Sequence, residues 1–432
     1  MISFLKFLSD YRAARLVLIA LLAVWLLPAH AGEDRLLGSN LAGLLDYARE
    51  HNPEFAASRF EAEAAVQRVQ PAAALPDPVL RTELMDITNQ GTNKGASLLP
   101  SQVGGTRYLL MQSVPWFGKR DLQHGVVEAQ VAQANSQTSA TWAELSSKIK
   151  SVYAMYYYLS GSERLARETL GLMGSLEQVA QTRYANGFGA QQDVIRAQVE
   201  QTDLHSELLN LENEQHHASV RLNALLSRPA MASLAQPVQL RPLPVVTQLD
   251  YAVLEEKLRA RSPQLQIANA RKNEAEKSRD LAYTNRYPGF TLGVAPTQSG
   301  SAVKSWDLMV EFNIPLQQES RRSQEREAEA LLSASGARKD ALLNQMLADL
   351  SESVSGLETA RRSEALIATR LLPQAELTYQ SALAGYETGK VDFATLLDAQ
   401  RQILKAGQQH LKAQFEAQVR LAEIERLLGE EL

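Results

Sequence analysis

The chain repeats itself once, and this repeat limits its fold more than any other feature. A motif that begins at Tyr184 has a glycine three residues later and ends in Ala-Gln, and it recurs in register at Tyr386, 202 positions further on. The same offset aligns the basic pair at 119–120 with the pair at 321–322. Agreement at separated landmarks is improbable by chance, so we predict two tandem copies of one structural unit.

The copies are joined by a proline-rich stretch. We place them at 32–228 and 250–432, with a linker at 229–249 between them. Prolines interrupt regular secondary structure, and the linker contains Pro229, Pro237, Pro242 and Pro244.

The N-terminus has the order of a secretory signal peptide. Three basic residues precede an apolar run at 16–27, and small residues stand at Ala29 and Ala31. The run is shorter than the roughly 20 residues that a membrane-spanning helix needs. We therefore expect a signal peptide at 1–31 and a mature chain that begins at Gly32.

Charge and cysteine content exclude several classes of protein. Without the signal peptide, the formal charge moves from −5 to −7, because three basic groups and one acidic group are removed. A mildly acidic exported chain is not typical of a nucleic-acid-binding protein. The sequence has no cysteine, so it can form no disulfide, no thiolate metal site and no lipid-modified N-terminal cysteine.

Each copy contains a very long helical hairpin. The segments 119–184 and 321–386 have no strong helix breaker except Gly171, Gly174 and Pro373, and each would form a helix of roughly 100 Å that is kinked or weakened there. The returning helices are predicted at 190–226 and 391–428, the second with a coiled-coil repeat at Leu397, Leu404 and Leu411. A shorter helix is predicted near the start of each copy, at 53–74 and 263–283.

Between the short and the long helix, the residue pattern changes to that of strands. The segment 306–312 alternates apolar residues with Asp307 and Glu311, and 290–295 alternates in the same way. The weaker counterparts in the first copy are 79–86 and 106–114, and the predicted turns are 89–95 and 298–301. A soluble sandwich also alternates, so the pattern alone does not indicate a membrane. In a membrane, Asp307 and Glu311 would line a lumen.

Four strands per chain are too few for a closed barrel. A barrel needs about eight strands, and open strand edges are not viable in lipid. If these strands cross a membrane, an oligomer has to complete the barrel.

This order of elements resembles the TolC-like outer-membrane efflux factors over the whole mature chain, and the motifs at 184–198 and 386–400 are similar to the family's periplasmic-tip repeats. The resemblance implies a mainly α protein with a small transmembrane β part. Three protomers would form a 12-stranded β-barrel on an α-helical tunnel, in the outer membrane of a Gram-negative bacterium. It implies a passive efflux channel, with a periplasmic adaptor and an inner-membrane pump of the resistance-nodulation-division type as partners.

The same resemblance assigns residues to the closed tip. The family seals the tip with hydrogen bonds and ion pairs, which implies a gate and adaptor-docking site at Tyr184, Gly187, Asp193, Tyr386, Gly389, Lys390 and Asp398. Val391 stands where the family has a gating arginine, and Thr395 replaces one of its aspartates. Capping of the returning helices is the alternative role for the aspartates.

The segment at 114–120, Val-Pro-Trp-Phe-Gly-Lys-Arg, resembles the heavy-metal efflux branch in particular. That branch serves pumps for cobalt, zinc, cadmium, copper or silver. Near this junction we predict residues that anchor the protein at the membrane interface, namely Trp116, Phe117, Lys119, Arg120, Arg321 and Arg322. Ordinary surface salt bridges are the alternative for the basic residues.

No motif supports an enzyme, a cofactor or a metal site. The sequence has no HExxH, Walker or GxSxG motif, and His205, His216 and His217 fit a solvated helix face. The main alternative function is a periplasmic coiled-coil adaptor. Such a protein would have one helical hairpin between β-rich segments instead of two tandem copies.

Overall fold

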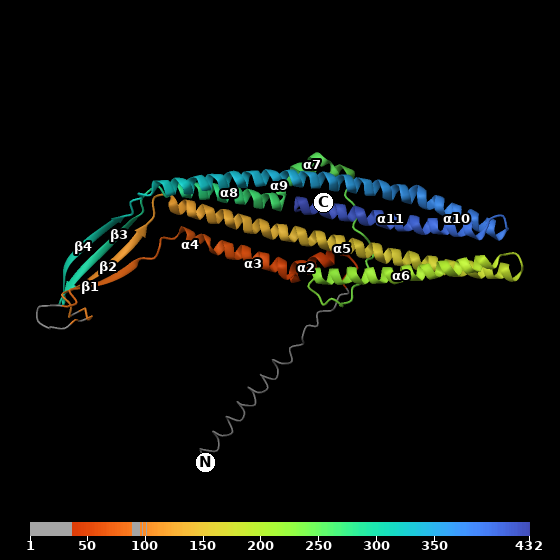
Figure 1. Cartoon of the computed structure of the whole chain (residues 1–432), viewed down its shortest axis with the longest axis horizontal. Coiled ribbons are helices and arrows are strands. Elements are labelled where there is room, and N and C mark those ends of the chain that lie inside the picture. Colours follow the sequence, from red (N-terminus) through yellow and green to blue (C-terminus); the bar gives the residue numbers. More distant parts are fainter. Residues whose placement is uncertain (1–36, 89–95, 97, 101) are drawn as a thin grey trace, which may run out of the picture.

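The molecule is elongated, with a β-sheet at one end and the turns of two helical hairpins at the other (Figure 1). Its computed structural model describes residues 37–88, 96, 98–100 and 102–432. The expected signal peptide and the predicted turn at 89–95 lie outside these residues.

The described residues of the first copy form two strands and five helices, and both long helices lie where they were predicted. Its elements are α2 (Leu41–His51), α3 (Pro53–Gln67), α4 (Val69–Ala73), β1 (Val79–Met85), β2 (Gly105–Val114), α5 (Lys119–Ala185) and α6 (Gln191–Leu225). Helix α3 begins at Pro53 because Asn52 caps it, its side chain accepting a hydrogen bond from the Phe55 amide at 3.0 Å.

The second copy repeats this order. After the 3₁₀ turn η1 (Val246–Leu249), its elements are α7 (Tyr251–Arg261), α8 (Pro263–Thr284), β3 (Phe290–Ser299), β4 (Ala302–Phe312), α9 (Gln318–Leu366), the π-helical turn η2 (Ile367–Leu371), α10 (Leu372–Glu387) and α11 (Phe393–Leu428). Helices α2 and α7 were not predicted. They are equivalent to each other, which extends the internal repeat.

The two outgoing helices differ where a break was predicted. Helix α5 continues through Gly171 and Gly174 without interruption. The second copy changes to the π turn η2 just before Pro373, with the Leu372 amide bonded to the Ile367 carbonyl. Proline has no amide hydrogen and its ring clashes with the carbonyl four residues earlier, and a wider turn accommodates it.

One antiparallel sheet joins the copies. Its strand order is β1-β2-β3-β4, so β2 of the first copy pairs with β3 of the second. The four strands lie close to their predicted positions. Gly300, with φ of 64°, forms the turn between β3 and β4 within the predicted segment.

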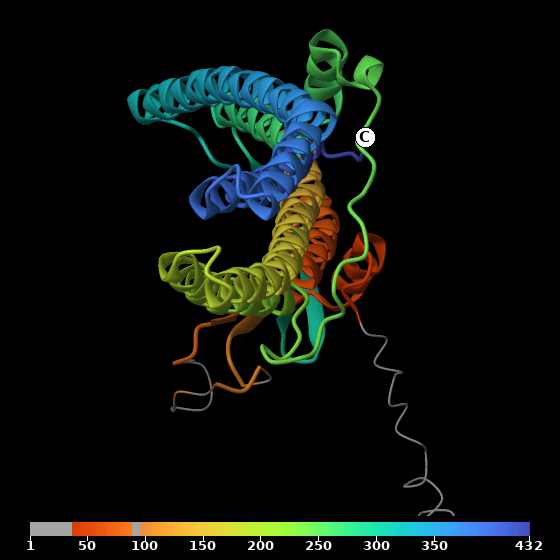
Figure 2. The same ribbon diagram turned by 90° about the vertical axis from the view of Figure 1, so that its right-hand side faces the viewer.

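The helices form a curved wall when viewed along the long axis (Figure 2). Their packing follows the predicted heptad in part, since Leu397 and Leu404 are buried and Leu411 is half-buried. The segment between the copies has little regular structure and crosses the helices near mid-length. The Tyr153 hydroxyl on α5 lies 3.0 Å from the Gln239 carbonyl there.

Candidate functional site

The sheet has one apolar, exposed face. Leu80, Leu110, Val294 and Leu308 are direct register neighbours across all four strands, and each is largely exposed. Leu308 is 76% exposed. Alternate residues of a strand point to opposite faces, so this ladder is a continuous apolar band on a single side of the sheet.

The opposite face carries charges. Arg107 on β2 lies 3.7 Å from Asp307 and 3.9 Å from Glu83. Asp307, Met309 and Glu311 are alternate residues of β4 and therefore share this face. Both predicted lumen residues, Asp307 and Glu311, thus lie on the face opposite Leu308. Exposed ion pairs at these distances contribute little stability. The same face also carries the buried apolar cluster of Leu109, Met111 and Ala295, so its character is mixed.

Both edges of the sheet are open. In the part of the chain that the structure describes, β1 and β4 each have one neighbour only. An exposed apolar face with two free edges invites pairing with further strands. In hydrocarbon those edges would have to be closed.

The turns at the other end are equivalent down to their hydrogen bonds. Gly187 and Gly389 have φ of 77° and 74°. In each turn the glycine amide bonds to the carbonyl of the motif tyrosine, and the next amide bonds to the residue before that tyrosine. This is the Schellman arrangement for ending a helix, and its left-handed position explains why both copies have glycine there.

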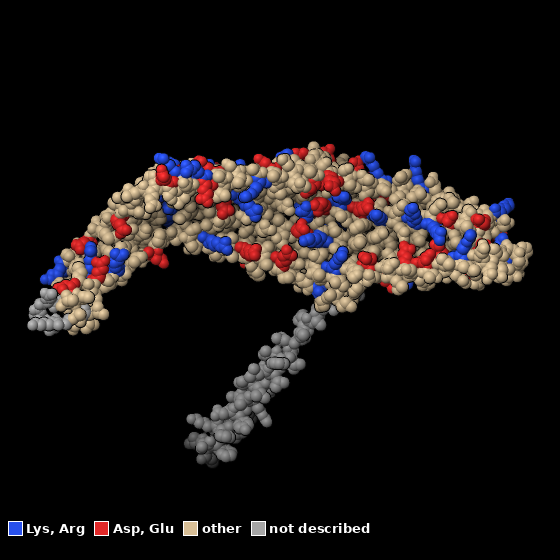
Figure 3. All heavy atoms as spheres, viewed as in Figure 1, with Lys and Arg blue, Asp and Glu red and all other residues tan. Residues whose placement is uncertain are grey.

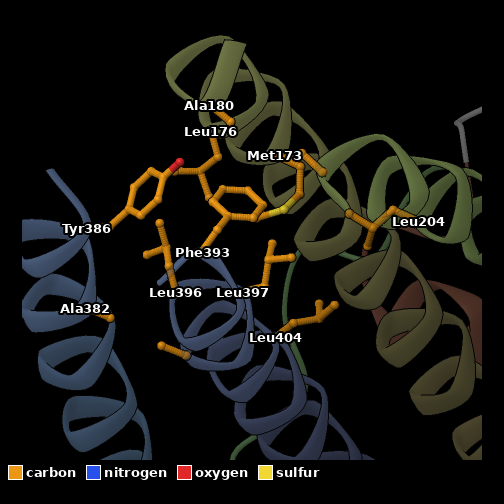
Figure 4. Packing of buried hydrophobic residues seen from close by; sticks show 12 residues of the cluster. Met173, Leu176, Ala180, Leu204, Ala382, Tyr386, Phe393, Leu396, Leu397 and Leu404 are labelled. Carbon is orange, nitrogen blue, oxygen red and sulfur yellow. The ribbon is translucent and has the colours of Figure 1, made fainter. Parts of the chain in front are cut away.

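The two motif tyrosines have different surroundings. Tyr184 is 48% exposed, whereas Tyr386 is 3% exposed and contacts the Phe393 ring, with centroids 5.3 Å apart. Figure 4 shows Tyr386 and Phe393 pointing towards Met173 and Leu176 of the first hairpin. Burial raises the pKa of the Tyr386 hydroxyl, and the Asp193 carboxylate raises it further.

Comparison with known proteins finds similarity to one family. Residues 254–430, within the second copy, match the model of the outer membrane efflux proteins. Over 397 residues and 90% of each chain, the chain is 22% identical to the cobalt-zinc-cadmium resistance protein CzcC of Cupriavidus metallidurans.

Solved structures agree on the fold of the chain. The outer-membrane channel OprN superimposes with a TM-score of 0.75 at 20% identity, covering 90% of this chain and 89% of OprN. CusC, solved in a study of folding and transmembrane channel formation, superimposes with a TM-score of 0.77 at 17% identity and covers 94% and 96%. The fold therefore matches these channel structures, and its two tandem hairpins differ from the single hairpin expected of an adaptor.

The basic residues at the junction of sheet and helices donate hydrogen bonds to other groups of the same chain. Lys119 donates to the Asn285 side chain at 2.8 Å, Arg321 donates to the Asn285 carbonyl, and Arg120 donates to the Ala73 carbonyl at 2.9 Å. These acceptors lie at the C-terminal ends of α8 and α4, where carbonyls lack helical partners and positive charge is favoured. Arg322 is exposed. The lipid-anchoring role of the four residues stays a prediction.

The aromatic residues of this junction form a cluster. Trp116 stacks on Tyr287 with centroids 5.0 Å apart, and Phe117 meets Trp116 edge-on at 5.7 Å. Phe117 is 76% exposed beside the end of the apolar sheet face. Such a position suits the interface of a bilayer, where aromatic rings are enriched.

The acidic residues of the tip differ in their surroundings. Asp193 lies in the first turn of α6 and is partly buried, and Asp398 is exposed and lies 3.7 Å from Arg401. The cap of α11 is a residue that sequence reasoning missed. Asp392 accepts hydrogen bonds from the Thr395 amide at 2.9 Å and the Thr395 hydroxyl at 2.6 Å, which lower its pKa. The available signal was an aspartate at the start of the helix predicted at 391–428, where the observed helix begins two residues later, at Phe393.

Arg183 is the second residue that sequence reasoning missed. It lies in the last turn of α5 and its guanidinium covers the Tyr386 ring, 4.8 Å from the centroid. Lys390 is exposed. Among the described residues, no group of three His, Asp or Glu could hold a metal ion.

In the described part of the chain, no helix is both long and apolar enough to cross a membrane.

Proposed function

We propose that the protein is the outer-membrane channel of a tripartite efflux system, a passive exit duct formed by three copies. The observation that carries this proposal is that the two ends of the elongated molecule have different structures. A sheet with an apolar face and two free edges lies at one end, and paired helical turns lie at the other (Figure 1). Three such sheets joined edge to edge would supply twelve strands.

The curved wall of helices supports a tunnel below that barrel. Each chain contributes two hairpins that lie side by side, and they are joined by the ion pair of Arg401 with Glu200 and by a hydrogen bond between Gln408 and Glu207. Charges of both signs are mixed along the face seen in Figure 3. A tunnel of this kind needs no catalytic group, and we propose that the protein is not an enzyme.

The relative CzcC supports divalent metal cations as the exported substrates. An adaptor and an inner-membrane pump of the resistance-nodulation-division type would deliver them to the tip. There the closed state would involve Tyr184, Gly187, Asp193, Tyr386, Gly389, Lys390 and Asp398. Asp307 and Glu311 would line the barrel lumen.

Two experiments test the proposal. Native mass spectrometry of the detergent-purified protein should give a trimer, and the same preparation should conduct in planar bilayers. A monomer without conductance would contradict the channel. Deletion of the gene should raise sensitivity to cobalt, zinc or cadmium, and sensitivity to drugs alone would contradict the metal assignment.

A further inference from the structure

Arg183 contacts both hairpin turns at once. Its Nη1 donates to the Glu387 carbonyl of the second hairpin at 2.9 Å, and its Nη2 donates to the Phe188 carbonyl of its own turn at 3.2 Å. The guanidinium also covers the Tyr386 ring. One side chain therefore joins the ends of the two hairpins.

The direction of the helices explains why a positive charge is favourable at this position. Helices α5 and α10 both run towards the tip, so their C-terminal ends, each with a partial negative charge, lie next to each other. Glu387 is the last residue of α10, and its carbonyl has no partner within the helix. The guanidinium lies between these two ends and offsets their repulsion.

The second copy has no residue that could make the equivalent contact to the first turn. The residue equivalent to Arg183 in the second copy is Gly385, and a Cβ built there would lie 2.5 Å from a Val391 methyl group. A side chain at this position would not fit. The second turn therefore cannot reciprocate, and its ends depend on Arg183.

Tyr386 contributes its ring and not its hydroxyl. The hydroxyl is buried and has no hydrogen-bond partner within the described residues. The ring face is the surface on which the guanidinium rests, an arrangement in which cation and aromatic quadrupole attract. Phenylalanine offers the same face.

We propose that Arg183 is the clamp that holds the two hairpin tips of one protomer together and so sets the resting width of the duct. This inference rests on the proposed channel function. The second hairpin, which Arg183 holds through the Glu387 carbonyl, has the π turn η2 in its outgoing helix, whereas the helix α5 that carries Arg183 is unbroken. Loss of the Arg183 contacts should therefore make the turn of the second hairpin more mobile than the turn of the first.

The test measures the distance between the two turns directly. Spin labels are placed on the exposed positions Phe188→Cys and Thr388→Cys of the full chain, which contains no other cysteine. Labelled subunits are diluted with unlabelled ones so that only distances within one chain are read. Bilayer conductance is recorded on the same variants.

We expect Arg183→Ala to lengthen and broaden the distance distribution and to increase the separated population about tenfold, the effect of losing a cation–π contact and two charge-assisted hydrogen bonds. Resting conductance should rise with it. Arg183→Lys should be intermediate, because an ammonium cannot fork between two carbonyls. Tyr386→Phe should match the parent and Tyr386→Leu should not.

Arg164→Ala is the matched control, since Arg164 is an exposed arginine earlier on the same helix. The clamp is refuted if Arg183→Ala keeps the parental distances in a folded protein, or if Tyr386→Phe alone separates the turns. If Arg183→Ala does not fold, Arg183→Lys decides between the same outcomes. A parent that does not conduct would refute the channel, while the distances would still test the clamp.

Discussion

Lys150 on α5 and Glu425 on α11 form an ion pair of 2.9 Å in which both side chains are almost completely buried. Arg241 of the linker donates to the same carboxylate at 2.7 Å, and Glu431 accepts from Lys150 at 2.8 Å. Two positive and two negative groups thus balance, with the Glu431 side chain at the surface. They join the linker and the C-terminal segment to a helix from each copy.

Removing one partner of this network should destabilise the protein strongly. Lys150→Ala leaves the Glu425 carboxylate buried with one cation fewer, and we expect a loss of about 3–5 kcal/mol in chemical denaturation. Arg420→Ala, which breaks the exposed pair with Glu352, should cost no more than about 1 kcal/mol. Similar losses from both variants would show that burial does not set the strength of these pairs.

The glycine after α11 should not tolerate a side chain. Gly429 has φ of 74°, and a Cβ there would lie 2.4 Å from the Pro263 ring. Gly429→Ala should therefore lower the unfolding free energy by about 1–3 kcal/mol. Gly336→Ala within α9, where no atom lies within 4 Å, should raise it by about 0.5–1 kcal/mol. The two denaturation midpoints are expected to move in opposite directions.

The two faces of the sheet should respond differently to substitution. Leu308→Arg places a charge in the apolar band, at a cost of about 2–4 kcal/mol near a bilayer midplane, and should reduce trimer yield in unheated gels of outer-membrane fractions. Asp307→Asn removes only a weak ion pair with Arg107 and should leave the trimer intact. Equal defects would mean that the apolar face does not contact lipid.

The cap of α11 should make the second tip sensitive to acid. The folded-state pKa of Asp392 is lowered from 3.8 by its hydrogen bonds from Thr395, so its stabilisation is complete above the unfolded-state pKa and is lost as pH falls through the folded value. The asparagine side chain of Asp392→Asn is neutral at every pH, so its cap does not change as the pH falls. In hydrogen exchange of the first turn of α11, parent and variant should differ at neutral pH and converge in acid. A difference that persists in acid would contradict this role.

Processing of the precursor gives a further prediction. We expect cleavage after Ala31, because small residues stand at 29 and 31, and no acyl chain, because the sequence has no cysteine. Mass spectrometry of the mature protein should place the first residue at Gly32. Residues 1–36 lie outside the described part of the chain, so this remains an inference from sequence.

Local features were predictable from the sequence because they depend on near neighbours along the chain. Alternation located β3 and β4, the absence of breakers located α5, and Gly187 with Gly389 marked two turns that share one hydrogen-bond pattern. Each of these signals is contained within a few residues, since backbone geometry is set by adjacent side chains.

Only the tertiary structure determined what each side chain contacts. Tyr184 and Tyr386 occupy equivalent positions, yet one is exposed and the other is buried against the opposite hairpin. Arg183 reaches a carbonyl 204 positions away, and Lys150 pairs with Glu425 across 275. A repeat predicts that two segments fold alike. It cannot predict how the copies lie against each other, because burial and electrostatics depend on the distances between groups in space, which sequence separation does not give.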